Sequence, residues 1–255
     1  MPTYMSNGIP STQTYWPDAN LTMTLEKQIE IYLKDLGAGF VRFVDLSHLA
    51  PKQNKGLPCA VVFGLVLSPG YIREVADTPD YVARRVENDY DFDDDEYYLN
   101  ELKTGELSDK LFGFLEEKGF RAHSLSDENQ AKQGDYDASL QATPLPHKTI
   151  ALLAGLGWIG RHNLLVTDKY GSGVNIGAVL TNALLSAHSY EPPFPKCGKC
   201  RQCVDVCQPG AIKGILWGKD VARDDIIDVE KCTTCLKCLV FCPWTQAYMK
   251  KASGF

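Results

Sequence analysis

The sequence has no long hydrophobic run, few histidines and no excess of basic residues. Its longest apolar stretch, residues 59–67, falls far short of the about 20 apolar residues that a membrane-spanning helix needs. The N-terminal residues have neither the basic region nor the apolar core of a secretory signal. We therefore expect a soluble, cytoplasmic protein with no membrane association.

The charge balance argues against direct binding to nucleic acid. Residues 1–190 carry 16 basic and 25 acidic side chains, and residues 191–255 carry 10 basic and 7 acidic ones, so the formal net charge is −6. The small basic excess of the second segment is too scattered to form a nucleic-acid footprint. A nucleic-acid substrate would therefore need help from a partner protein.

Length and proline distribution predict two domains. The 255 residues, 44% of them hydrophobic, are enough for a sizeable core. The Pro-rich stretch at residues 191–195 reads as a stiff linker. We expect an irregular N-terminal extension over residues 1–20, an α/β cofactor-binding domain over 21–190, and a smaller domain over 191–255.

Hydrophobic periodicity predicts alternating helices and strands in the larger domain. Apolar residues at helical spacing begin after Thr24 and stop at Gly37. Strands are expected at residues 40–46, 59–67, 120–125 and 174–182, further helices at 78–102 and 107–118, and loops at 51–58 and 126–146. The alternation favours a mixed α/β (α+β) layer fold.

Eight of the nine cysteines fall into two copies of one spacing, with gaps of two, two and three residues. They are Cys197, Cys200, Cys203 and Cys207 in the first copy, and Cys232, Cys235, Cys238 and Cys242 in the second. This is the spacing of bacterial ferredoxins, which hold two [4Fe–4S] clusters. It predicts a protein that transfers single electrons.

The spacing also predicts which cysteines share a cluster. In a double-cluster ferredoxin the fourth cysteine of each run ligates the other cluster. Cys242 should therefore complete the cluster of the first run, and Cys207 that of the second. Structural zinc also uses pairs of cysteines two residues apart, but it does not explain a third cysteine at the same interval, twice. The ninth cysteine, Cys59, lies in an apolar strand pattern and is expected to be a packed core thiol.

A glycine-rich segment follows the predicted loop. Gly155, Gly157 and Gly160 match the G-x-G-x-x-G pattern of dinucleotide sites. Such a site also needs an acidic residue about 20 positions later to bind the ribose, and residues 179–182 contain none. A tight turn that packs glycine against backbone is the simpler interpretation.

The residues around this segment resemble a known family. The stretch AGLGWIGRHNLL (residues 154–165), the turn Tyr170-Gly171-Ser172 and the cysteine runs ending in Cys-Pro-Trp are similar to epoxyqueuosine reductases. These are cobalamin-dependent iron–sulfur enzymes related to reductive dehalogenases. The resemblance is sharp over residues 144–244 and looser over 24–125. It implies a nitroreductase-like domain that holds base-off cobalamin, followed by a ferredoxin-like double [4Fe–4S] domain.

The resemblance also implies an electron path and a cofactor site. Electrons would pass from a small reductant protein, such as a ferredoxin or flavodoxin, through an outer and an inner cluster to cobalt. Trp158 could pack against the corrinoid or fill the core. The residues implied to line the corrinoid are Gly155, Gly157, Trp158, Gly160, Arg161, Tyr170, Gly171 and Ser172.

Two departures from the family argue against the queuosine reaction itself. Where the family has its catalytic aspartate, three residues before Pro144, this sequence has Gln141, which cannot donate a proton as an acid does. The family's tRNA-gripping helical-repeat domain is expected to be missing, since the sequence stops at Phe255. His147 and Tyr98, with Tyr97 as its alternative, are the proton donors that we consider.

The sequence thus predicts an iron–sulfur reductase that uses cobalamin on a small molecule or modified nucleoside. Three alternatives stay open: an electron carrier without corrinoid, a reductase that uses FMN, and a tRNA epoxyqueuosine reductase that acts with a partner.

Overall fold

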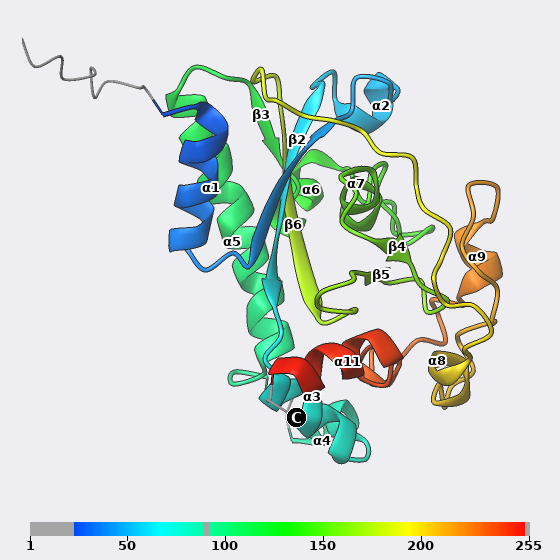
Figure 1. Cartoon of the computed structure of the whole chain (residues 1–255). Helices are drawn as coiled ribbons and strands as arrows, with labels where there is room; N and C mark the ends of the chain where they lie inside the picture. The colour runs from blue at the N-terminus through cyan, green and yellow to red at the C-terminus, as the bar shows by residue number, and fades with distance from the viewer. Residues whose placement is uncertain (1–22, 89–91, 253–255) are drawn as a thin grey trace, which may run out of the picture.

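A computed structural model describes residues 23–88 and 92–252; the extension expected over residues 1–20 lies outside them. The described chain contains a four-stranded sheet with the order β1-β2-β6-β3, in which every neighbouring pair is antiparallel (Figure 1). Its strands are β1 (Phe40–Asp45), β2 (Cys59–Val66), β3 (Ala122–Ser124) and β6 (Val174–Thr181). A separate two-stranded ribbon pairs β4 (Trp158–Ile159) with β5 (Leu165–Val166).

Helices lie on both faces of this sheet and at one of its ends. Those of the N-terminal part are α1 (Leu25–Asp35), α2 (Pro51–Asn54), α3 (Pro69–Asp77), α4 (Tyr81–Glu87), α5 (Glu96–Glu117), α6 (Asp127–Gln133) and α7 (His147–Leu153). Those of the cysteine-rich part are α8 (Gln202–Asp205), α9 (Arg223–Ile226), α10 (Lys237–Val240) and α11 (Pro243–Ala252). None of the helices in the described ranges is long and apolar enough to cross a bilayer.

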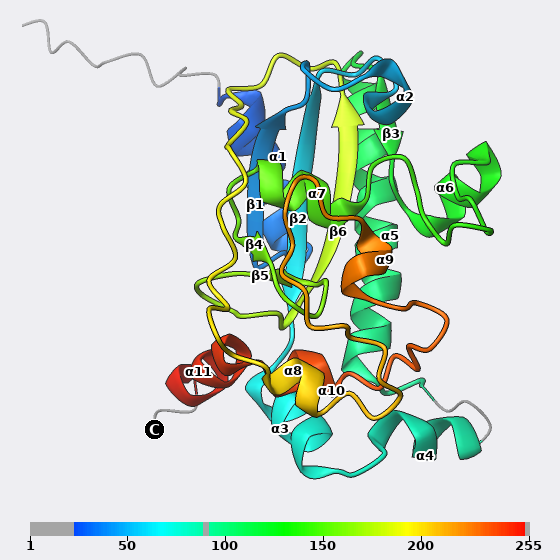
Figure 2. The same cartoon turned by 90° about the vertical axis from the view of Figure 1, so that its right-hand side faces the viewer.

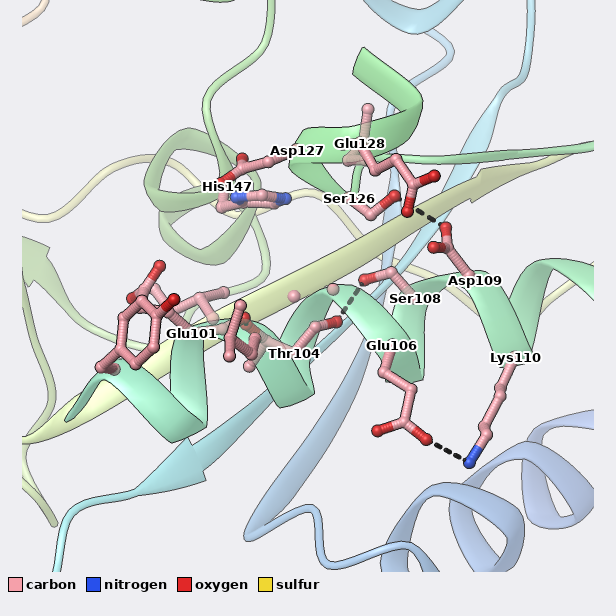
Figure 3. A pocket seen from close by; sticks show the side chains of 16 residues that line it. Glu101, Thr104, Glu106, Ser108, Asp109, Lys110, Ser126, Asp127, Glu128 and His147 are labelled. Atoms are coloured by element: carbon pink, nitrogen blue, oxygen red, sulfur yellow. Dashed lines mark hydrogen bonds and ion pairs between the residues drawn. The ribbon is translucent and has the colours of Figure 1, made fainter. Parts of the chain in front are cut away.

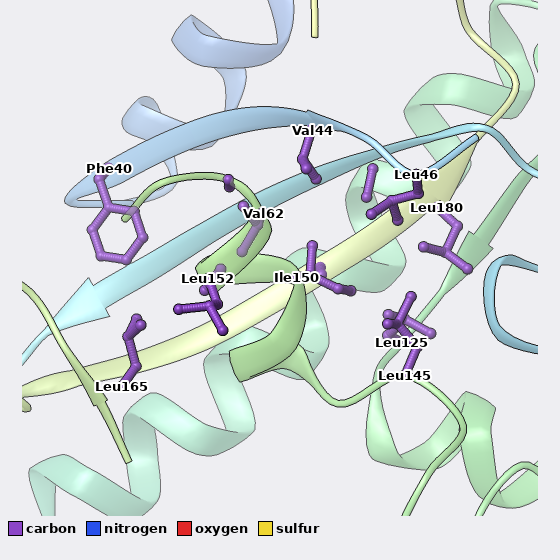
Figure 4. Packing of buried hydrophobic residues seen from close by; sticks show 14 of the residues in the cluster. Phe40, Val44, Leu46, Val62, Leu125, Leu145, Ile150, Leu152, Leu165 and Leu180 are labelled. Carbon is purple, nitrogen blue, oxygen red and sulfur yellow. The ribbon is translucent and has the colours of Figure 1, made fainter. Parts of the chain in front are cut away.

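Each face of the sheet has its own core. Helices α1 and α5 cover one face, where Leu33 and Leu111 pack on Phe63, and α7 covers the other, where Ile150 packs on Val62 (Figures 2 and 4). Strand β2 is therefore buried on both sides, which explains its continuous run of apolar residues.

The cysteine-rich part packs beneath the end of the sheet. Helices α10 and α11 contact α3, and Leu239 and Val240 share a buried cluster with Leu67 and Ile72. The Nζ of Lys237 donates to the carbonyl oxygens of residues 75 and 78, each at 2.7 Å. The two parts of the chain thus share a core across the expected linker.

The predicted mixed α/β fold is confirmed, with corrections in its helices. The loop expected over residues 51–58 contains α2, and the one expected over 126–146 contains α6. The helices expected at 78–102 and 107–118 are instead α4 and one continuous α5, preceded by α3. Helix α3 begins at Pro69, and the side chain of Ser68 caps its N-terminus. A Ser-Pro pair also begins turns, so this signal alone does not predict a helix.

Candidate functional site

The eight patterned cysteines include spatial neighbours from both runs, and we name them by the two clusters that the sequence predicts. We call Cys197, Cys200, Cys203 and Cys242 the first cysteine set, and Cys207, Cys232, Cys235 and Cys238 the second. Burial raises the pKa of Cys203 to about 12, and the neighbouring charges that add to this rise are those of the other three members of the first set. Burial also raises the pKa of Cys238, helped first by Cys235 and Cys232 and more weakly by Cys203 and Cys207. Cys242, distant in sequence, is therefore a spatial neighbour of the first run.

The backbone around both sets is shaped for sulfur ligands. Thr234 and Leu236 have φ values of 51° and 61°, and Gly198 has a φ of 52°, so each cysteine loop reverses sharply. Cys242 precedes α11, and the backbone N–H groups of Trp244 and Thr245 donate hydrogen bonds to its sulfur. Such N–H donors stabilise a thiolate.

The donor set suits a cluster better than a single ion. Each set offers four thiols, which are soft ligands, and two of those in the first set, Cys203 and Cys242, are buried. Within residues 23–88 and 92–252, no three His, Cys, Asp or Glu side chains converge on one point as ligands of a single ion do. A cubane differs, because each thiolate binds a different iron corner.

Arg161 holds the first cysteine loop in place. Its guanidinium donates to the carbonyl oxygen of Cys200 at 3.0 Å, to that of Gly198 at 2.8 Å, and to that of Gly214. Its charge also lowers the pKa of Cys203. The structure thus places Arg161 beside the cysteines, where it contacts the loop backbone.

The glycine-rich segment packs against protein. A Cβ on Gly157 would lie 1.9 Å from the carbonyl oxygen of Val166, and one on Gly160 would lie 2.7 Å from the His162 ring. Trp158 is fully buried, edge-on to Trp244 with ring centroids 4.8 Å apart. These residues brace the β4–β5 ribbon against the chain around Cys242, which agrees with the simpler interpretation of the motif.

The remaining residues implied to line a corrinoid are scattered. Gly155 and Tyr170 line a separate cavity of about 290 Å³ on the β1 side. A Cβ on Gly171 would lie 2.2 Å from the backbone nitrogen of Thr245. Ser172 does line a polar cavity, described next.

Two adjoining cavities lie between α5, β6 and α7. The larger, of about 710 Å³, and the smaller, of about 310 Å³, share Glu101, His147 and Ile176 as lining residues. In Figure 3, Glu101 projects from α5 and His147 lies near Asp127 on the opposite side of β6. Leu239, next to Cys238 in the second set, also lines the smaller cavity.

Two buried acceptors in these walls have no protein partner. His147 hydrogen bonds to the carbonyl oxygen of Leu125, which occupies one ring nitrogen, while its buried Nε2 is unpaired. Burial lowers the pKa of His147, so at neutral pH its Nε2 carries a lone pair. Asn175, which is 1% exposed, donates from Nδ2 to Glu101 Oε1 at 2.6 Å, and its Oδ1 is unpaired. A bound ligand with N–H or O–H donors would satisfy both.

A second polar group in the smaller cavity is held by a buried histidine. The backbone N–H of Leu164 donates to His162 Nδ1 at 3.1 Å, so the ring proton belongs on Nε2, which lies 3.1 Å from Ser172 Oγ. The Ser172 hydroxyl hydrogen is then available to a ligand. Lys148 lines the same cavity, and burial lowers its pKa to about 8.

The predicted proton donors are separated by the structure. His147 lies where the two cavities meet, whereas Tyr98 lines only the larger of the two and is 43% exposed. Its neighbour Tyr97 lines the smaller cavity, and the charges of Cys238 and Cys232 act on it. Gln141, at the expected aspartate position, is exposed and accepts a hydrogen bond from Arg223 through its backbone oxygen.

Sequence reasoning missed Glu101, Lys148 and Asn175. Glu101 is one of many acidic residues on a long helix, so nothing marks it. Asn175 had a signal: it is an amide within an otherwise apolar strand pattern, at residues 174–181. A buried amide in such a strand needs a partner.

Comparison with known proteins agrees with the resemblance. No protein-family model matches the chain. It is 44% identical over 77 residues to an epoxyqueuosine reductase from Synechococcus sp. (strain CC9605), covering 30% of this chain and 23% of that one. It is 26% identical over 197 residues to one from Aliivibrio fischeri, covering 71% and 51%. The chain thus spans between about a quarter and a half of these curated relatives.

Solved structures share the fold. An epoxyqueuosine reductase from Streptococcus thermophilus superposes with a TM-score of 0.52 at 15% identity, over 88% of this chain and 67% of that one. The catabolic reductive dehalogenase NpRdhA gives a TM-score of 0.59 at 19% identity, over 89% and 33%. The chain is therefore similar in sequence to epoxyqueuosine reductases over part of their length, and it shares its fold with an epoxyqueuosine reductase and a reductive dehalogenase.

Proposed function

We propose that this chain is a cobalamin-dependent iron–sulfur reductase, with two [4Fe–4S] clusters in residues 191–255 and base-off cobalamin in the joined cavities of residues 21–190. The observation that carries the proposal is the polar cavity beside the second cysteine set, with two buried acceptors that no protein group satisfies. When bound, cobalamin supplies a low-potential metal centre that can reduce organic substrates.

The walls suit the edge of a corrin ring. Its carboxamide side chains are N–H donors, and His147 Nε2 and Asn175 Oδ1 are unpaired acceptors. Ser172 adds an oriented hydroxyl. Polar groups that converge in a mostly preformed cavity are typical of cofactor sites. In this proposal His147, Asn175 and Ser172 hold the cofactor, while the glycine-rich segment supports the site from behind.

The arrangement of the cysteine sets supports an order for electron transfer. The charges of Cys238 and Cys232 act on Tyr97, which lines the smaller cavity. We therefore assign the inner cluster to the second set and the outer one to the first, whose loop accepts hydrogen bonds from Arg161. A small reductant protein would deliver electrons one at a time to the outer cluster.

Similar proteins indicate two classes of substrate. Relatives are named for epoxyqueuosine and a structure of similar fold holds 3-bromo-4-hydroxybenzoic acid. Gln141 supplies no acid at the family's aspartate position. We propose a small-molecule or modified-nucleoside substrate, with reduction of epoxyqueuosine in tRNA as the alternative that needs a partner.

The proposal is tested by the composition of anaerobically purified protein. It predicts eight irons per chain and one bound corrinoid after incubation with hydroxocobalamin. Eight irons with no corrinoid retained would support an electron carrier instead. Released flavin would support the FMN alternative, and two zinc ions without iron would contradict the cluster assignment.

A further inference from the structure

We propose that Glu101 is the catalytic acid that delivers the proton during the reduction. This inference rests on the proposed function and adds to it a group that replaces the family's aspartate.

The carboxyl group of Glu101 is built into the cavity walls. It lines both joined cavities, so it faces the proposed cofactor space and also the wider opening. Asn175 Nδ2 donates to its Oε1 at 2.6 Å, and the Tyr97 hydroxyl, one helical turn away on α5, hydrogen bonds to the same carboxyl group. With Oε1 fixed by the amide, the acidic proton can sit on Oε2.

The surroundings favour the protonated form. The Glu101 residue is exposed overall, but its carboxyl group lies among protein groups at the cavity wall, and this desolvation is the largest cause that raises its pKa. The hydrogen bond from Asn175 lowers the pKa, the negative charge of Asp127 on α6 raises it, and the hydrogen bond from Tyr97 lowers it less; the net direction is upward. From α7, His147 is neutral because burial lowers its pKa, and burial also lowers the pKa of Lys148. From β6, Asn175 brings no charge. A carboxylic acid that stays protonated closer to neutral pH is suited to donate.

The other candidate donors are less suitable. His147 already gives a hydrogen bond to Leu125, and its buried Nε2 has no proton at neutral pH. It therefore accepts where Glu101 donates. Gln141 has no acidic proton and is exposed. Tyr98 does not line the smaller cavity, whereas Glu101 does.

The proton and electron balance is simple. Two electrons come from the reductant protein through the clusters. Reduction of an epoxide also takes two protons, the first from Glu101 Oε2 to the oxygen as its carbon–oxygen bond breaks and the second from water, whereas an aryl bromide takes one proton, from Glu101 Oε2 to the carbon that gains the electron pair. For an aryl bromide the carbon–bromine bond breaks, a carbon–hydrogen bond forms and bromide leaves. Glu101 is left as a carboxylate, and water in the larger cavity reprotonates it.

Infrared spectroscopy and turnover together test this role. The variant is Glu101→Gln, which keeps the size and the contact with Asn175 but has no acidic proton. The matched control is Glu116→Gln, an exposed residue of the same helix. Wild type should show the C=O stretch of a protonated carboxylic acid, titrating above the usual range of glutamate, and Glu101→Gln alone should lose it.

Turnover is measured in cobalamin-loaded protein with reduced methyl viologen and two probes, epoxyqueuosine nucleoside and 3-bromo-4-hydroxybenzoic acid. Glu101→Gln should slow turnover by about 10²–10⁴-fold, with unchanged iron content and corrinoid spectrum, and Glu116→Gln should not. An absent infrared band, or a band with unchanged turnover in Glu101→Gln, would overturn the assignment. Failure of wild type to bind the corrinoid or to reduce either probe would instead contradict the proposed reductase function.

Discussion

The backbone N–H of Ser172 donates to Thr245 Oγ1 over 2.9 Å, and both residues are almost fully buried. This bond joins the turn before β6 to the first turn of α11, directly after Cys242. Gly171 approaches so closely that a Cβ there would lie 2.2 Å from the Thr245 nitrogen. The cavity wall and the first cysteine set are therefore held in one rigid arrangement.

This contact predicts a severe effect of Gly171→Ala. The added Cβ meets backbone, and a φ of 58° strains any side chain. We expect the free energy of unfolding to fall by about 1–3 kcal/mol or more, with early loss of iron, measured by anaerobic denaturation followed through the cluster absorbance. Gly113→Ala in α5, where the Cβ meets nothing within 4 Å, should instead raise stability by up to about 1 kcal/mol. Equal stability of the two variants would contradict this packing.

The crossed cysteine sets predict which cluster each serine variant damages. Cys242→Ser should disturb the cluster of Cys197, Cys200 and Cys203, because those thiols surround it. Cys207→Ser should disturb the other cluster. Electron paramagnetic resonance of the reduced proteins distinguishes the two signals. If Cys242→Ser removed the signal that Cys232→Ser also removes, the assignment of Cys242 to the cluster of the first cysteine set would be wrong.

The hydrogen bonds from Arg161 to the first cysteine loop predict that the cluster of the first cysteine set is less stable in Arg161→Gln. The substitution removes charged donors from the carbonyl oxygens of Gly198 and Cys200. We expect faster iron release to a chelator, by about tenfold if one charge-assisted hydrogen bond is lost, and a more negative reduction potential for that cluster. Lys199→Gln removes the same charge from an exposed position in the loop and serves as control; equal release rates in both variants would show that charge alone matters.

Stability should fall in acid partly because of His162. Burial lowers its pKa from 6.5 to about 4, with a smaller contribution from the charge of Lys148. The pKa of His162 is lower in the folded state than in the unfolded state. The stability that the neutral buried ring allows is therefore complete above pH 6.5 and is lost as the pH falls toward 4. His162→Gln should therefore show a shallower loss of stability between these pH values than wild type, in anaerobic thermal denaturation. His188→Gln, at an exposed site, should follow the wild-type curve; an unchanged slope in His162→Gln would refute a neutral buried ring.

Part of this architecture was predictable and part was not. The cysteine spacing predicts which residues group together because the cluster's geometry is local and fixed. Strand β2 follows from an unbroken apolar run, and β6 from an apolar run interrupted by Asn175. The role of the glycine-rich motif could not be decided from its spacing, because the close approach of Gly157 to the carbonyl oxygen of Val166 is a contact with the neighbouring strand that spacing alone does not reveal.

The catalytic carboxylate was hidden for a different reason. Glu101 differs from other glutamates of α5 only through what faces it: Asn175 from β6 and Asp127 from α6. Those contacts arise from tertiary packing, which no local pattern encodes.

The central claim is that the polar cavity beside the second cysteine set holds a corrinoid. The most direct measurement is an anaerobic absorbance titration of cluster-reconstituted protein with cob(II)alamin. The account predicts a saturable shift to the base-off spectrum at one equivalent per chain, weakened in a variant that removes both unpaired acceptors, His147→Phe with Asn175→Leu. A spectrum that stays base-on at every protein concentration, while both clusters are intact, would contradict it.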